Sequence, residues 1–143
     1  MTLDQIIEEW TRDSNVDKTE LADESLKIIS LVAKYMRWYK TEKLKLIHLK
    51  TKLAQLKLAK REFYTMGPHE DTPPDWKLPP QGRVIKNEVQ DYIDADNDVI
   101  TMNLRVSVQQ EKSDLLYDII KELNNRRWSI RAAIDFLKWT QGG

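Results

Sequence analysis

Residues 21–63, LADESLKIISLVAKYMRWYKTEKLKLIHLKTKLAQLKLAKREF, carry the repeat that decides the fold. Thirteen positions alternate by four and three residues along this stretch, and ten of them are apolar. Such spacing places one stripe along one side of a helix, so we predict a helix of about 65 Å whose stripe packs against a partner helix. We expect a bend or break at Glu42. The stripe consists of Leu21, Ser25, Ile28, Val32, Tyr35, Tyr39, Glu42, Leu46, Leu49, Leu53, Leu56, Lys60 and Phe63.

The same helix concentrates the positive charge of the chain. Residues 34–61 hold ten of the 23 basic residues and a single acid, although the formal net charge of the whole chain is zero. The flanking segments are acidic, with three basic against eight acidic residues in 1–33 and three against nine in 62–98. Because a block this positive repels itself, we expect a polyanion or an acidic surface to lie against it.

The positions beside the stripe sharpen this expectation. Between residues 43 and 59, five of the six flanking positions are lysine and the sixth is Ala59. In a parallel homodimer these like charges would face each other, so a simple zipper is disfavoured. Acidic segments of neighbouring subunits and a bound polyanion both remain open as partners of these lysines.

Residues that break helices gather in one short window. All five prolines lie between Pro68 and Pro80, and the four glycines are at positions 67, 82, 142 and 143. We therefore predict an N-terminal helical segment over 1–64, an ordered or semi-ordered Pro-rich linker over 65–83, and a C-terminal helical segment over 84–143.

The N-terminal segment begins with a second, shorter apolar repeat. Leu3, Ile6, Ile7 and Trp10 predict a short amphipathic helix that ends near residues 12–15. Asp17 and Glu20 resemble a capping box, so we expect them to start the long helix.

The C-terminal segment carries two conflicting patterns. Apolar and polar residues alternate strictly from Ile100 to Val108, which is typical of a strand, so helix and a short β segment near 99–108 both stay open. Residues 115–123 return to helical spacing, and Asn124 and Asn125 predict a turn before an aromatic-rich last helix. The expected fold is mainly α, with a long basic helix and a C-terminal helical hairpin.

Several classes of function find no support in these residues. The chain has no cysteine, and its two histidines have no neighbour at metal-ligand spacing. Residues 94–98 resemble the opening of a calcium loop, but Val99 and Arg105 replace the required glycine and glutamate, so we predict a helix cap. We expect no catalysis, no metal and no cofactor. Without an apolar run of about 18 residues or a signal peptide, we expect a cytoplasmic protein that does not bind membranes.

The end of the basic helix is the best candidate for a binding site. Residues 57–64, KLAKREFY, place cations beside two aromatic rings; the cations attract phosphates, and a ring stacks on an unpaired base. We assign Phe63 to the apolar stripe, whereas Tyr64 lies off it and stacking or a structural role are equally open. In the last helix, arginines surround Trp128, and there we expect core or subunit contacts.

Taken together, these segments resemble the UvsY family, the recombination mediators of T4-type phages. The resemblance spans nearly the whole chain and rests on the shared order of short pieces. They are Asp17–Leu21, Glu24–Ile28, Lys34–Tyr35, Lys60–Tyr64 with Gly67, Tyr92–Asp96, Asn125–Arg131, Ala133–Asp135 and Gly142–Gly143.

The resemblance implies a non-enzymatic protein of DNA recombination, repair and replication in the host cell cytoplasm. Such a protein binds single-stranded DNA, forms a homo-oligomeric ring, with a heptamer or hexamer favoured, and helps a RecA-like recombinase displace the single-strand-binding protein. A lysine and an arginine implicated in DNA binding in the T4 member align with Leu58 and Lys60, so only the second charge is kept. The family also implies self-association through the C-terminal part, and it favours a helix over a strand for residues 99–108.

Two residue sets follow from these patterns. For single-stranded DNA binding we predict Lys43, Lys45, Lys50, Lys52, Lys57, Lys60, Arg61 and Tyr64. For oligomerisation we predict Leu116, Ile120, Trp128, Ile134, Phe136 and Trp139.

The alternative function is an oligomeric scaffold whose basic stripe binds acidic protein segments. If the chain instead neutralises about five phosphates of a single strand, the logarithm of the binding constant should fall with log salt at a slope of about −3.5.

Overall fold

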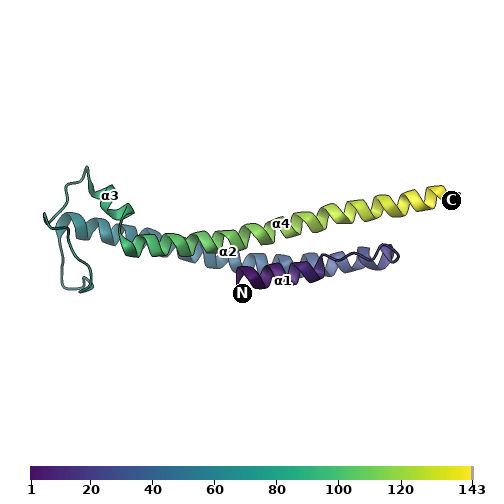
Figure 1. Cartoon of the computed structure of the whole chain (residues 1–143), viewed down its shortest axis with the longest axis horizontal. Coiled ribbons are helices and arrows are strands. Elements are labelled where there is room, and N and C mark those ends of the chain that lie inside the picture. The colour runs from purple at the N-terminus through teal and green to yellow at the C-terminus, as the bar shows by residue number, and fades with distance from the viewer. Residues whose placement is uncertain (143) are drawn as a thin grey trace. The chain divides into compact units, whose positions relative to one another are not determined.

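The computed structural model describes residues 1–142; Gly143, the last residue of the terminal glycine pair, lies outside them. The helices of residues 1–142 are α1 (Leu3–Asp13), α2 (Leu21–Met66), α3 (Val89–Asp94) and α4 (Asn97–Thr140), as labelled in Figure 1. Residues 1–142 contain no strand. The prediction of a mainly α fold, with a long helix and a C-terminal helical hairpin, is confirmed. None of the helices in residues 1–142 combines the length and apolarity that a membrane span requires.

The chain packs into two compact units. Unit 1 combines Met1–Lys45 with the chain from Val108 onward, and unit 2 is Leu46–Ser107. Each unit therefore contains part of α2 and part of α4. The predicted division into 1–64, 65–83 and 84–143 follows the order of the sequence. The packing instead joins the N-terminal and C-terminal parts of the chain in unit 1.

Unit 1 begins with α1, which a capping box starts. The hydroxyl of Thr2 accepts from the backbone N–H of Gln5, and the Gln5 side chain accepts from the backbone N–H of Thr2. This satisfies donors that the first turn of a helix leaves free. Ile6 is fully buried, as the short apolar repeat predicts, whereas Ile7 of the same repeat is 46% exposed.

The core of unit 1 joins three helices. Ile6 of α1 packs with the α2 stripe and with one face of α4. The ring of Tyr35 contacts Trp10 and Trp38 edge-on at centroid distances of 5.8 and 5.2 Å. The buried residues of this core are Ile6, Ile28, Leu31, Tyr35, Leu116, Ile119, Leu123 and Ile130.

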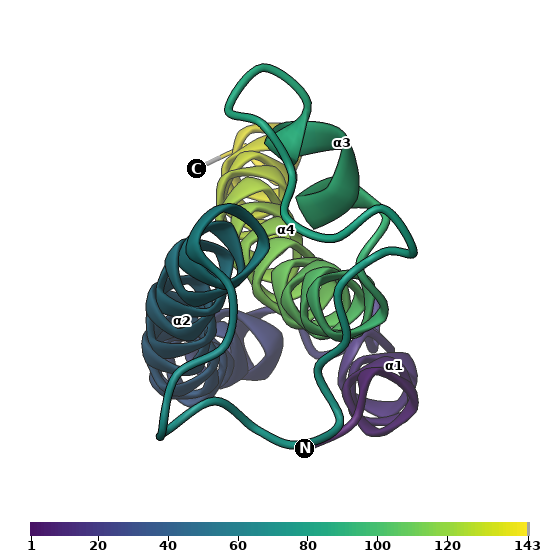
Figure 2. The same ribbon diagram turned by 90° about the vertical axis from the view of Figure 1, so that its left-hand side faces the viewer.

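Unit 2 has its own core around the end of α2. The helix ends at Met66, and Gly67 follows with a φ of +87°, a left-handed conformation that closes helices and favours glycine. The linker then runs to α3 without a helix or strand (Figure 2). Its Trp76 and Leu78 pack on the core formed by Phe63, Tyr64, Val84, Val89, Ile93 and Val99. The linker is thus ordered by apolar contacts.

The α2 stripe behaves as its spacing predicts. All thirteen positions from Leu21 to Phe63 are buried or half-buried, including the polar Ser25, Glu42 and Lys60. The expected break at Glu42 is absent, because α2 continues through this residue as one helix. Instead Gln109 donates to the Glu42 carboxylate at 2.6 Å and to its backbone carbonyl at 2.8 Å, so the buried acid is satisfied inside unit 1.

Three local predictions need correction. The Asp17 carboxylate accepts from Thr19 in a short turn, so it does not form a capping box with Glu20. Residues 99–108 are helical, because their buried or half-buried apolar positions, Val99, Met102 and Val106, follow helical spacing. The turn at Asn124 and Asn125 is absent: both side chains are exposed, and α4 continues through them.

The hairpin turn of the C-terminal part lies between α3 and α4. One carboxylate oxygen of Asp96 accepts from the backbone N–H groups of Asp98 and Val99 at 2.9 and 3.2 Å. Asp96 is therefore the N-cap of α4. The prediction that the acidic run at 94–98 is a helix cap is confirmed.

Candidate nucleic-acid interface

The basic block from Lys34 to Arg61 is only partly neutralised by the chain itself. Three of its ten cations make ion pairs: Lys34 with Glu9 and Asp13, Lys45 with Glu42, and Lys60 with Asp96 and Asp98. The other seven have no carboxylate within 4.0 Å among residues 1–142. They are Arg37, Lys40, Lys43, Lys50, Lys52, Lys57 and Arg61.

Five of the predicted DNA-binding cations lie on the part of α2 that belongs to unit 2, and four of them, all except Lys60, make no ion pair in the described chain. Lys50, Lys52 and Arg61 are exposed and Lys57 is half-buried. The guanidinium of Arg61 donates to the side-chain oxygen of Gln90 at 2.8 Å, which orients it without neutralising its charge. These four side chains present uncompensated positive charge to solvent.

Lys43 and Lys45 belong to unit 1. Lys43 is half-buried and lacks an ion-pair partner in the described chain, whereas Lys45 is exposed and lies 3.4 Å from the Glu42 carboxylate. The Glu42 carboxylate is buried, but 52% of the Lys45 side chain is exposed, so the Lys45 amine remains accessible from solvent.

Lys60 does not lie at the surface, and the prediction that it faces a ligand is corrected. Its side chain is 4% exposed. The amine lies 3.0 Å from Asp96 and 2.9 Å from Asp98, and 3.8 Å from the centre of the Trp76 ring. Burial of a lysine requires such partners, because an unpaired charge away from water is unfavourable. Lys60 stabilises unit 2.

Tyr64 is also buried, so the expectation that its ring is free to stack on a base is corrected. Its hydroxyl donates to Asp96 at 2.6 Å, and burial together with this bond raises the pKa of Tyr64. Burial by itself would raise the pKa of Asp96. Hydrogen bonds from Tyr64, Lys60 and the Val99 backbone outweigh that effect and hold the pKa below its ordinary 3.8.

Two residues close to Lys60 and Tyr64 in sequence, Phe63 and Leu58, differ from each other in burial. Phe63 is buried in the core of unit 2, as its assignment to the stripe predicts. Leu58, the position where a family cation aligns, is 57% exposed. Its exposure places an apolar side chain among the surface cations of α2.

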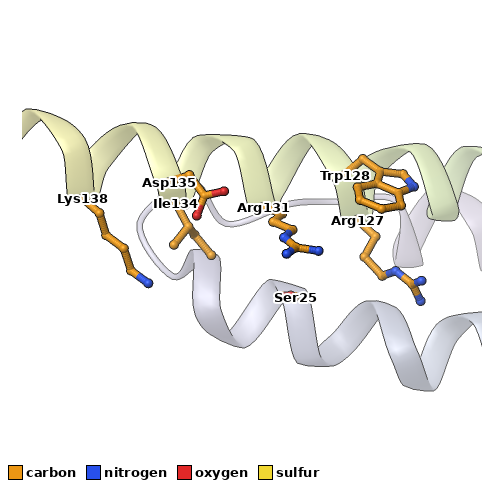
Figure 3. Close-up of a pocket in the computed structure, with 7 residues that line it drawn as sticks. All are labelled: Ser25, Arg127, Trp128, Arg131, Ile134, Asp135 and Lys138. Atoms are coloured by element: carbon orange, nitrogen blue, oxygen red, sulfur yellow. The ribbon is translucent and has the colours of Figure 1, made fainter.

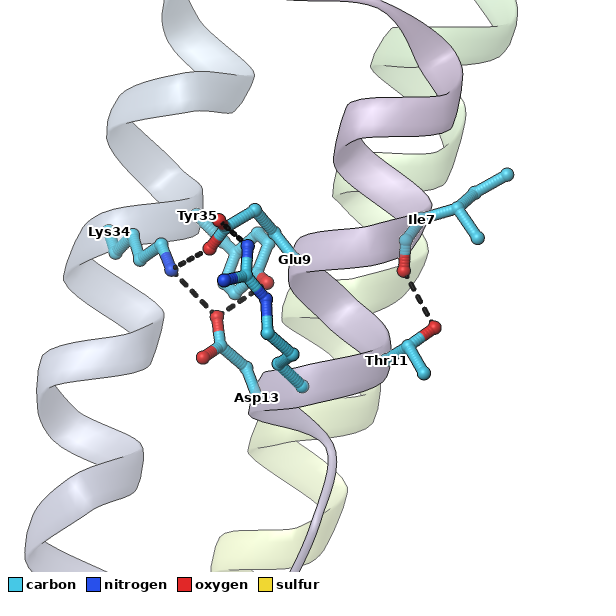
Figure 4. Close-up of polar contacts among 7 residues, drawn as sticks. Ile7, Glu9, Thr11, Asp13, Lys34 and Tyr35 are labelled. Atoms are coloured by element: carbon cyan, nitrogen blue, oxygen red, sulfur yellow. Dashed lines mark hydrogen bonds and ion pairs between the residues drawn. The ribbon is translucent and has the colours of Figure 1, made fainter.

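A second charge cluster, which is half-buried, lies in unit 1 and was not predicted from sequence. Figure 4 shows Lys34 of α2 pointing at Glu9 and Asp13 of α1, with amine-to-carboxylate distances of 2.8 and 2.7 Å. The Tyr35 hydroxyl donates to Asp13 at 2.8 Å. Burial opposes ionisation of Asp13, but the bonds from Lys34 and Tyr35 outweigh it, so the pKa of Asp13 lies below 3.8. The first cation of the basic block thus anchors α1.

The residues predicted for oligomerisation fall into two groups. Leu116 is fully buried in the core of its own chain, and Ile120 and Ile134 pack against that core, so Leu116 is not available to a neighbour. In contrast, the rings on the last turns of α4 are exposed. Trp128, Phe136 and Trp139 are 63%, 62% and 74% exposed.

No group of three or more histidine and acidic side chains in residues 1–142 is arranged to hold a metal ion.

The chain matches one described family. The family "Recombination, repair and ssDNA binding protein UvsY" matches residues 9–143. Two crystal structures of the bacteriophage T4 recombination mediator protein UvsY have the same fold. One has a TM-score of 0.81 at 20% identity, covering 100% of this chain and 99% of that chain. The other, from a different crystal lattice, has a TM-score of 0.78 at 18% identity, covering 98% of this chain and 99% of that chain. No curated protein matches the chain.

Proposed function

The chain belongs to the UvsY family of recombination, repair and single-stranded-DNA-binding proteins, and from this we propose that it is a recombination mediator. In this proposal it binds single-stranded DNA in the cytoplasm of the host cell and promotes the loading of a RecA-like recombinase against the single-strand-binding protein. It acts by binding, without catalysis.

One observation carries the proposal. In unit 2, α2 presents Lys50, Lys52 and Arg61 to solvent with Lys57 beside them, and no carboxylate within the described chain neutralises them. Phosphates supply the missing negative charge, and each contact releases counterions from the strand. Lys43 and Lys45 extend the candidate set into unit 1.

This chemistry suits a mediator. Cations that hold the phosphate backbone leave the edges of the bases free, so a recombinase can still pair the strand. Contacts of this kind do not depend on the DNA sequence. A protein that acts on any exposed strand requires this property. Self-association into a ring of six or seven subunits would multiply weak contacts on one strand. The exposed rings of Phe136 and Trp139 on α4 favour such self-association.

A recombinase-loading assay tests the proposal. Single-stranded DNA is first covered with single-strand-binding protein, and the lag before recombinase assembly is measured. We expect the wild-type chain to shorten the lag and the Lys50→Glu, Lys52→Glu protein to lose this effect. A matched double variant, Lys18→Glu with Lys86→Glu, reverses the same number of charges at exposed residues elsewhere and should act as wild type. A wild-type chain that binds the strand but leaves the lag unchanged would contradict the mediator role.

One finding favours the alternative, an oligomeric scaffold that binds acidic segments. Lys34 and Lys60 of the basic block already bind carboxylates of their own chain. Native mass spectrometry with an oligonucleotide and with an acidic peptide separates the two functions. The mediator takes up the oligonucleotide at moderate salt, whereas the scaffold takes up only the peptide.

A further inference from the structure

Unit 1 carries a hollow of about 450 Å³ between the start of α2 and the last turns of α4. Figure 3 shows Arg127, Arg131 and Lys138 projecting from α4 towards the side of α2 that carries Ser25. Trp128 and Asp135 also line it. We call this hollow the α4 groove; it shares no residue with the cations of unit 2.

The α4 groove has an excess of positive charge. Three cations and one carboxylate line it. None of the three cations has a carboxylate within 4.0 Å in the described part of the chain, so none serves an ion pair of the fold. The adjacent Arg126 shows the difference, since it pairs with Glu122 at 3.2 Å, donates to the Ser14 carbonyl and lies over the Trp10 ring. Arg126 thus has partners within the fold, whereas Arg127, Arg131 and Lys138 make no ion pair in the described part of the chain.

An aromatic face lies beside these cations. Trp128 is 63% exposed, and the Arg131 guanidinium lies 5.9 Å from the centre of its ring. An exposed tryptophan next to guanidinium groups is the combination on which unpaired bases stack while phosphates bind the cations. An acidic peptide would satisfy the charges but leave the exposed ring without a partner.

We propose that the α4 groove is a second contact for single-stranded DNA. The phosphates bind Arg127, Arg131 and Lys138, and a base stacks on Trp128. This inference rests on the proposed function, because it requires that the chain binds single strands. It assigns Trp128 to the ligand and leaves Phe136 and Trp139 as the candidates for subunit contacts.

Matched charge-removal variants test the groove. Arg127→Ala with Arg131→Ala removes two groove cations, and Arg105→Ala with Lys121→Ala removes the same charge from exposed residues of α4 outside it. A labelled oligodeoxynucleotide is titrated at several salt concentrations. If each arginine neutralises one phosphate, the groove variant loses about 1.4 from the magnitude of the salt slope, which is about 25-fold in affinity at about 0.1 M salt. Equal affinity and slope in both variants would overturn the inference.

Asp135→Asn tests the groove in the opposite direction. Removing the one carboxylate should strengthen binding of the oligodeoxynucleotide, a gain that a folding defect cannot produce. Unchanged or weaker binding would contradict a phosphate in this groove. A bromodeoxyuridine oligonucleotide supplies a direct readout, since irradiation should cross-link it to the peptide that contains Trp128.

The mass of the assembly separates the remaining explanations. Light scattering should give the same mass for wild type and for the Arg127→Ala, Arg131→Ala protein. A smaller mass that accompanies the loss of affinity would identify the groove as a subunit contact and overturn the inference. A wild-type chain that fails to bind any oligonucleotide would instead refute the proposed function itself.

Discussion

The amine of Lys60 lies 3.0 Å from the carboxylate of Asp96, and the two side chains are only 4% and 7% exposed. Asp96 is also the N-cap of α4. The pair therefore joins the last turns of α2 to the first turn of α4 within unit 2. A cation from the basic block, where the sequence predicts DNA contacts, is used to hold the unit together.

Removing Lys60 should destabilise the protein. Lys60→Met keeps much of the aliphatic volume but leaves Asp96 buried without its charged partner, so the free energy of unfolding should fall by about 3 kcal/mol or more. Lys52→Ala, at an exposed position, should change it by less than about 0.5 kcal/mol. Urea unfolding of both variants measures the difference. Similar losses in the two proteins would show that the buried pair contributes nothing.

Stability should fall in acid because of Asp96 and Asp13. The pKa of each carboxyl lies below its ordinary 3.8 in the folded protein, so the folded state binds fewer protons than the unfolded chain near that pH. The resulting stabilisation is complete above about pH 5 and is lost as the pH falls through the folded pKa. Urea unfolding across this range should show the decline.

Asp96→Asn identifies the residue responsible. The variant should be less stable than wild type at about pH 6, and this difference in stability should shrink as the pH falls through 3.8, because the wild-type carboxyl is then protonated first in the unfolded chain and, at lower pH, in the folded protein. If the difference in stability between the two proteins stays constant with pH, the ionised Asp96 carboxylate does not cause the loss of stability in acid.

Glu42 and Gln109 should depend on each other. Gln109→Leu leaves a buried carboxylate oxygen of Glu42 without its donor, and Glu42→Leu leaves Gln109 only the backbone carbonyl of residue 42, so each variant should lose about 1–3 kcal/mol of stability. The double variant Glu42→Leu, Gln109→Leu removes both groups and should recover most of that loss. Thermal unfolding of the three proteins provides the cycle. Additive losses would argue against a direct interaction between them.

Leu116 and the terminal aromatic pair should affect different properties. Leu116→Ala opens a cavity in the core of unit 1, so it should lower the free energy of unfolding by about 2–5 kcal/mol. Phe136→Ala with Trp139→Ala removes exposed rings, so it should leave that energy nearly unchanged and reduce the mass of the assembly. Light scattering and urea unfolding are measured on both. An assembly that keeps its mass without the two rings would rule them out as the subunit contact.

The α2 stripe could be predicted from sequence because burial follows the helical period. All thirteen of its positions are buried or half-buried. The partners of its polar members could not be predicted, since Gln109 lies 67 residues from Glu42 and Asp98 lies 38 residues from Lys60. Lys60 has a charge that favours the surface and a stripe position that favours burial, and in the structure it is buried.

The alternation at 99–108 misleads for a physical reason. Val99, Met102 and Val106 form the inner side of α4, while Ile100, Leu104 and Val108 form a second, exposed stripe of the same helix. Two apolar stripes on one helix combine into a pattern that resembles a strand. The exposed cations of α2 were predictable because they lie beside the stripe; the α4 groove was not, because it requires the packing of α4 on α2 in unit 1.

The salt dependence of single-stranded DNA binding tests the central claim most directly. Lys57→Glu with Arg61→Glu changes two cations of unit 2 and leaves Lys60 in place, and the control Lys18→Glu with Lys86→Glu changes the net charge equally. If about five phosphates are neutralised, the wild type and the control should both show a slope of about −3.5. The slope of the unit 2 variant should be smaller in magnitude by at least about 1.4. Identical slopes for the two variants, or no binding by the wild type in dilute buffer, would contradict DNA binding by the basic helix.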